Sequence, residues 1–95
     1  MKNPISYCCL FLVLLACSSQ LYIPTESSAT VSFVDLKKGR ELYVNNCASC
    51  HQLYTPNKFS EKEWTENLNE MQPKAKITDE EKQLIYQYIT NAPRQ

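Results

Sequence analysis

Apolar residues recur at helical spacing in three stretches of the chain, and residues that cap or break helices bound each stretch. The first predicted helix runs from Asp35, a good N-cap residue, to Asn46. One face of this helix consists of Leu36, Gly39, Tyr43 and Cys47. A glycine inside a helix costs about 1 kcal/mol relative to alanine. Gly39, the only glycine of the chain, therefore needs a structural reason to be there.

The second predicted helix covers residues 60–70 and opens with a capping box formed by Ser60 and Glu63. Its apolar stripe consists of Trp64, Leu68 and Met71. This spacing predicts that Met71 ends the helix on its buried side. We expect a linker over residues 72–77, because a proline interrupts the helical pattern there.

A second capping box, formed by Thr78 and Glu81, opens the last predicted helix, and Pro93 ends it. Its broad apolar stripe consists of Leu84, Ile85, Tyr88, Ile89 and Ala92. The pattern as a whole predicts an all-α domain of about three helices over residues 35–95.

The N-terminal residues carry a different signal. Lys2 precedes an apolar run over residues 5–16, which has the size of a signal-peptide core and is short for a membrane span. The run ends in Leu-Leu-Ala before Cys17, which resembles the lipobox of bacterial lipoproteins. The resemblance implies that residues 1–16 are a removed signal peptide and that Cys17 carries the lipid, so that the protein is anchored to a membrane in the bacterial cell envelope and faces the periplasm. The alternatives are an ordinary secretory signal, which would leave Cys17 as a spare thiol, and an uncleaved N-terminal anchor.

Serine and threonine dominate the segment that follows, and Glu26 is its one charged residue. Such a composition predicts that residues 17–34 form a flexible tether after the lipidated cysteine. As a coil it would span on the order of 20–25 Å. The alternative is that Val31, Phe33 and Val34 pack on the domain as a short extended segment.

Cys47-Ala48-Ser49-Cys50-His51 is the candidate functional motif. C-x-x-C-H is the pattern of c-type haem attachment, in which two thiols form thioethers with one porphyrin and the histidine becomes the proximal iron ligand. His51 is the only histidine of the chain. A zinc half-site, a redox dithiol or a disulfide are the alternatives, but no second Cys or His pair follows to complete a zinc site.

With this motif the chain resembles the c-type cytochrome family. Gly39, Tyr43 and Cys47 match the glycine, aromatic and first haem cysteine of the family's N-terminal helix, while Ile85 and Tyr88 match the pair on its C-terminal helix. The resemblance implies one covalent haem c, with these two helices crossing closely at Gly39. It also implies that residues 52–59, with Tyr54 and Phe59 as apolar cover, lie along one haem edge.

The resemblance further implies that Met71 is the distal iron ligand, because the family's methionine also lies between the middle and last helices. The alternative is a methionine that only fills the core. A domain of about 60 residues has a marginal core of its own. We therefore expect the haem to serve as part of the interior and the haem-free chain not to fold stably.

Charge adds little about partners. Ten basic and ten acidic residues balance, and loss of Lys2 would leave 9 − 10 = −1. The sequence has no basic patch that would indicate binding to nucleic acid. The resemblance to c-type cytochromes implies one-electron transfer to membrane or periplasmic redox partners, with no small-molecule substrate and no enzymatic activity. There are two alternatives. One is a haem protein with an open distal site that acts as a sensor or an enzyme subunit, and the other is a non-haem zinc or structural module.

Overall fold

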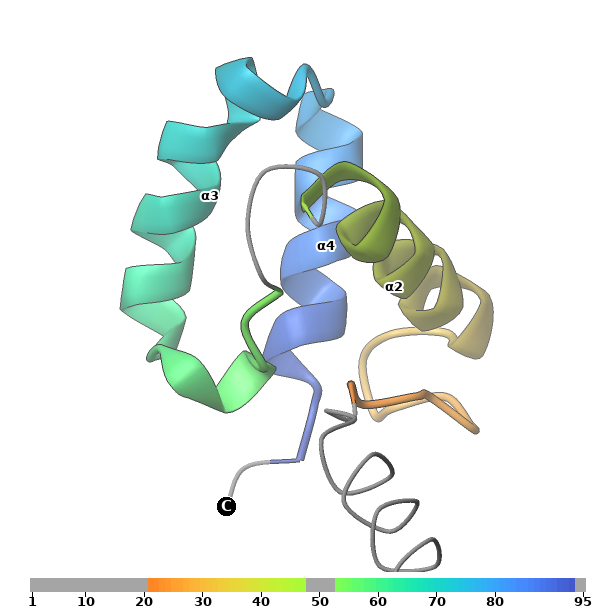
Figure 1. Cartoon of the computed structure of the whole chain (residues 1–95). Helices are drawn as coiled ribbons and strands as arrows, with labels where there is room; N and C mark the ends of the chain where they lie inside the picture. Colours follow the sequence, from red (N-terminus) through yellow and green to blue (C-terminus); the bar gives the residue numbers. More distant parts are fainter. Residues whose placement is uncertain (1–20, 48–52, 94–95) are drawn as a thin grey trace, which may run out of the picture.

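The structure is a computed structural model, and it describes residues 21–47 and 53–93. Over these residues the elements are α2 (Phe33–Cys47), the short 3-10 helix η1 (Pro56–Lys58), α3 (Glu61–Ala75) and α4 (Asp79–Thr90). No strand occurs among them, which confirms the predicted all-α class. Figure 1 shows α4 between α2 and α3. Within the described ranges, no helix has the length and apolar character needed to cross a membrane.

The crossing of α2 and α4 forms the centre of the fold. Leu36 on α2 is 1% exposed, and Ile85 and Tyr88 on α4 are fully buried. Gly39 lies at the crossing point, where a Cβ atom would overlap the backbone carbonyl oxygen of Leu84 and stand 2.8 Å from the Cβ of Tyr88. The predicted close approach at Gly39 is confirmed, and it explains why a poor helix former occupies a helix interior.

The first helix begins two residues earlier than predicted. It starts at Phe33, and Ser32 caps it in place of Asp35. The Ser32 hydroxyl accepts a hydrogen bond from the Asp35 amide at 3.1 Å, and its carbonyl accepts one from Leu36 at 3.0 Å. Asp35 instead lies in the first turn, where its negative charge suits the positive end of the helix dipole.

The linker predicted for residues 72–77 is wrong over residues 72–75, because α3 continues to Ala75 with Pro73 inside it. Pro73 is exposed and lies in the last turn, so the amide hydrogen bond that it cannot make is lost where water can replace it. The helix ends at Lys76, which adopts the left-handed conformation with φ 57° and donates its amide to the Gln72 carbonyl. A left-handed residue in this position is a usual way to stop a helix.

Both predicted capping boxes are confirmed. At the start of α3, the Ser60 hydroxyl accepts from the Glu63 amide at 3.2 Å and the Glu63 carboxylate accepts from the Ser60 amide at 3.0 Å. Thr78 and Glu81 make the same reciprocal pair at the start of α4. The helix α4 then ends at Thr90, three residues before Pro93, so its predicted end is also close.

Residues 21–32 differ from the flexible tether that their composition predicts. Pro24 and Val31 are buried, and the ring of Tyr22 stacks on that of Tyr88 with centroids 5.6 Å apart. The alternative of a packed segment before the domain is therefore the correct one for Val31, while Val34 is 72% exposed. The side chains of Ser27 and Ser28 bond here to the backbone of a turn, which composition alone does not reveal.

Candidate functional site

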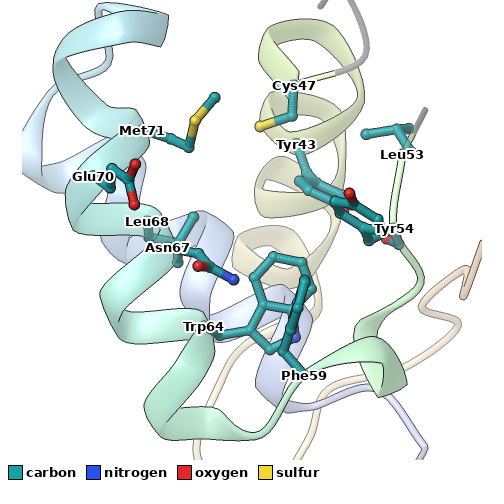
Figure 2. A pocket seen from close by; sticks show the side chains of 10 residues that line it. All are labelled: Tyr43, Cys47, Leu53, Tyr54, Phe59, Trp64, Asn67, Leu68, Glu70 and Met71. Carbon is teal, nitrogen blue, oxygen red and sulfur yellow. The ribbon is translucent and has the colours of Figure 1, made fainter. Parts of the chain in front are cut away.

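A cavity of about 280 Å³ lies between α2, α3 and the segment of residues 53–59. Figure 2 shows its lining from close by. The lining residues are Tyr43, Cys47, Leu53, Tyr54, Phe59, Trp64, Asn67, Leu68, Glu70 and Met71. Aromatic and aliphatic side chains predominate, so the cavity suits a flat apolar group better than a hydrated ion.

Aromatic rings packed edge to face form one wall of the cavity. The ring of Trp64 meets that of Tyr43 with centroids 6.1 Å apart and that of Phe59 with centroids 5.1 Å apart. Tyr54 meets Phe59 in the same manner at 5.3 Å. Edge-to-face pairs at these distances are favourable beyond their buried area, so these rings stabilise one another in the wall.

Two side-chain hydrogen bonds attach residues 53–59 to the helices behind them. The Tyr43 hydroxyl on α2 donates to the Tyr54 carbonyl at 2.5 Å. The Trp64 indole N–H on α3 donates to the Pro56 carbonyl at 2.8 Å. Buried Tyr and Trp need partners for their polar atoms, and here those partners lie on the segment that borders the cavity. The segment is thereby positioned by the two helices that it bridges.

Burial raises the pKa of the Tyr43 hydroxyl well above its ordinary value. The hydroxyl therefore stays protonated at neutral pH and remains a hydrogen-bond donor. Tyr43 is 3% exposed and stands one helical turn before Cys47. It thus stands in the wall of the cavity as a hydrogen-bond donor.

Two sulfur atoms reach the cavity from different helices. Cys47 is the last residue of α2, and Met71 comes from the apolar stripe of α3 that also carries Trp64. In Figure 2 the side chains of Cys47 and Met71 point toward each other across the upper part of the cavity. Residues that are 24 positions apart in the sequence are thus brought to one place, as the interpretation of Met71 as a ligand requires.

Other predicted site residues lie outside the described residues. Cys50 and His51 belong to the undescribed segment 48–52, and Cys17 precedes the first described residue. The predicted cover of the cavity by Tyr54 and Phe59 does fall within the structure, and both side chains line it.

Three lining residues were not singled out from the sequence, namely Leu53, Asn67 and Glu70. Asn67 could have been found, because it follows Trp64 by three positions and precedes Met71 by four, which places all three on one helix face. Glu70 is exposed, and its carboxylate lies 3.8 Å from the Lys74 ammonium. Asn67 and Glu70 are thus the two polar side chains of the lining that were not singled out from the sequence.

Comparison with known proteins identifies the domain. Residues 34–89, more than half of the chain, match the family model described as cytochrome c oxidase, cbb3-type, subunit III. The chain belongs to this family of c-type cytochrome domains. No curated protein and no solved structure matches it.

A c-type cytochrome domain carries covalent haem c with its iron, and this is the cofactor of the chain. The described residues fit such a group, because an apolar aromatic cavity receives a cysteine sulfur and a thioether, the donors that haem attachment and iron ligation use. The alternative of a non-haem zinc or structural module is not supported by the family match. The domain is a small monohaem cytochrome c that serves in electron transfer.

Proposed function

We propose that the protein is a membrane-tethered one-electron carrier of the bacterial cell envelope. In this proposal Cys47 and Cys50 would hold the haem through thioethers, and His51 and Met71 would ligate its iron. Bound haem supplies one iron that exchanges a single electron between its ferric and ferrous states. The main observation in support is that Cys47 and Met71, on different helices, both line the same apolar cavity.

The position of Met71 on α3 favours a stable distal ligand over an open site. Its backbone belongs to a regular helix that begins with a capping box and ends with a left-handed residue, so it is held at both ends. A thioether is a soft ligand that stabilises ferrous iron and raises the reduction potential. That combination suits a carrier, whereas a sensor or a peroxidase needs a vacant or labile position.

The lining of the cavity also favours electron transfer over substrate chemistry. Among its described lining residues, Glu70 carries the one carboxylate, and that carboxylate is exposed and lies close to Lys74. Tyr43 stays protonated, and its hydroxyl donates to a backbone carbonyl. The described residues thus place no general base within the cavity.

The test of the ligand is Met71→Ala in holoprotein made by an export-competent host that matures c-type cytochromes. We expect loss of the weak red absorption band of sulfur-ligated ferric haem and a fall in the reduction potential. Glu66→Ala, an exposed change on the same helix, is the matched control and should leave both unchanged. An unaltered spectrum and potential in Met71→Ala would reject Met71 as the ligand, and carbon monoxide binding by the unmodified protein would then support an open distal site.

Two further measurements test attachment and anchoring. The mass of the mature protein should include one haem and a lipid on its N-terminal cysteine. Cys17→Ser should remove the lipid and release the protein from membranes, while the haem remains. Cys50→Ala should instead weaken haem attachment and leave the lipid in place. Haem that dissociates under denaturing conditions from the unmodified protein would contradict the covalent link.

A further inference from the structure

Residues 21–32 form a segment that we call the strap. It lies before the part of the chain that matches the family, which begins at residue 34. In Figure 1 it is the orange to gold stretch that leads into α2. Its contacts with α2 and α4 determine how the chain enters the cytochrome domain.

The first part of the strap is fixed by Tyr22. The Tyr22 ring stacks on the ring of Tyr88, which is fully buried, with an interplanar angle of 16°. The Tyr22 carbonyl accepts hydrogen bonds from the Tyr88 hydroxyl at 2.6 Å and from Nε of Arg40 at 3.1 Å. Ring and carbonyl are therefore held by different atoms of the α2–α4 pair, which fixes the direction of the chain as well as its position.

The second part of the strap is a turn with internal bonds. The Ser28 hydroxyl accepts from the Val31 amide at 2.9 Å, and the Ser28 amide donates to the Val31 carbonyl at 2.9 Å. The Ser27 hydroxyl accepts from the Phe33 amide at 2.8 Å, which joins the turn to the start of α2. Val31 is 8% exposed and Pro24 is buried, so the turn also contributes apolar contacts. The strap is consequently part of the folded domain.

The strap changes the reach of the proposed lipid anchor. Three residues, 18–20, separate Cys17 from Leu21, and four steps of at most about 3.5 Å give a maximum reach of about 14 Å. A domain of about 70 residues has a diameter of roughly 28 Å by the usual scaling of the radius of gyration. The connection from Cys17 to Leu21 is therefore shorter than the diameter of the domain. With so short a connection the domain cannot rotate freely above a bilayer.

We propose that the strap makes the anchor a short, fixed mount, which holds the cytochrome domain against the membrane surface with one side facing the lipid. The proposal rests on the lipidation of Cys17 in the proposed function. No described strap residue lines the cavity, so the strap itself does not cover it. The partner that fits this arrangement is a redox protein of the same membrane, with its electron-exchanging centre close to the surface.

The test uses the full lipidated holoprotein in vesicles whose headgroups carry a fluorophore that the haem quenches. One variant receives ten Gly-Ser residues between Ser19 and Gln20, which leaves the strap untouched. If the strap is fixed, only the four residue-to-residue steps from Cys17 to Leu21 are flexible. The insertion should then increase the root-mean-square distance between the lipid and the domain from about 11 to about 21 Å, nearly twofold. A flexible tether of 17 residues predicts growth from about 23 to about 29 Å, about 1.3-fold. The size of the fall in fluorophore quenching on insertion distinguishes the fixed strap from the flexible tether.

A second variant, Tyr22→Ala with Val31→Ser, releases the strap without lengthening the chain, and Thr25→Ala at an exposed strap position is its control. We expect about a twofold increase in the distance between lipid and domain for Tyr22→Ala with Val31→Ser, and no increase for Thr25→Ala. Hydrogen exchange of residues 21–32 in the unmodified protein should be slowed at least about tenfold relative to an unstructured chain. The released variant should lose that protection while its helices remain.

The outcomes separate the mount from the anchor. Lipid present with unprotected strap amides, or with only a 1.3-fold change on insertion, would overturn the mount and leave the proposed function intact. Absence of lipid on Cys17 would overturn the anchor and the mount together, even where the strap amides are protected. Lipid, protected amides and a near-twofold change support the proposal.

Discussion

The packing at Gly39 makes Gly39→Ala the most informative single change in the domain. The added Cβ would overlap the Leu84 carbonyl oxygen and lie 2.8 Å from the Cβ of Tyr88, whereas ordinary contact begins near 3.4 Å. Relief of the Tyr88 contact alone would require 3.4 − 2.8 = 0.6 Å of separation, and the closer overlap with the Leu84 carbonyl oxygen requires more. Neither obstacle can rotate away, because one is backbone and the other is the first atom of a fully buried side chain.

The expected cost follows from two opposing effects. Overpacking of a core costs about 1–3 kcal/mol, and the rigid neighbours place this site near the upper end. Alanine restores about 1 kcal/mol of helix propensity relative to glycine. The net loss is therefore about 2 kcal/mol in the free energy of unfolding. For a domain of this size that corresponds to a fall in Tm of roughly 8–16 °C.

The assay is thermal and denaturant unfolding of the holoprotein, followed by far-ultraviolet circular dichroism and by haem absorbance in parallel. Lys37→Ala on the exposed side of α2 is the matched control and should change stability by less than about 0.5 kcal/mol. A Gly39→Ala protein as stable as that control would refute the close crossing of α2 and α4. A more stable one would show that helix propensity outweighs packing at this site.

Three further predictions concern the aromatic core and the cofactor. Tyr43→Phe removes one hydrogen bond to the Tyr54 carbonyl, and should cost about 0.5–1.5 kcal/mol and speed hydrogen exchange in residues 53–59, without changing exchange in α4. Burial raises the pKa of Tyr88 to about 12, although Arg40 beside it acts in the opposite direction. Because the unfolded chain loses this proton near pH 10, stability should fall as the pH rises from 10 to 12, and Tyr88→Phe should make that fall shallower. The haem-free chain should show reduced helical circular dichroism and no cooperative melting transition, and full helicity with a sharp transition would contradict the role of haem as part of the core.

Much of the helical framework could be predicted because its signals are local. Ser60 with Glu63 and Thr78 with Glu81 satisfy backbone amides through side chains three positions away, so the sequence alone contains both partners. The close approach at Gly39 was also predictable, because a glycine in a helix interior gives up helix propensity and so indicates a contact too close for any side chain. The position of Met71 on the cavity side of α3 followed from the spacing of the apolar stripe.

The strap and the end of α3 could not be predicted, because distant or weak effects decide them. Tyr22 acquires its partner Tyr88 from 66 positions away, and a serine-rich composition gives no sign of that contact. Pro73 normally breaks a helix, but in the last turn it forfeits a single exposed hydrogen bond, which solvent replaces. Propensity rules weigh such residues as if they stood in the middle of an element.

The two halves of the domain differ in what holds them together. The strap, α2 and α4 bury Leu36, Ile85 and Tyr88 almost completely among protein atoms, so the haem contributes less directly to the packing of this half. The helix α3 contributes two buried side chains, Trp64 and Leu68, and these two line the cavity together with Met71.

The cavity-facing stripe of α3 includes Met71, so the proposed distal ligand lies on the helix whose packing depends most on the haem. Haem and α3 should therefore stabilise each other. The bound group completes the contacts of α3, and α3 in turn places Met71 at the cavity. Partial unfolding should accordingly begin with α3, before the α2–α4 crossing separates, because the crossing keeps its own contacts. In that order of events, loss of the proposed Met71 ligand under mild denaturant would precede loss of the stack between Tyr22 and Tyr88. If the proposed lipid mount is present, the strap would then still hold the domain at the membrane after the reduction potential of the haem had fallen.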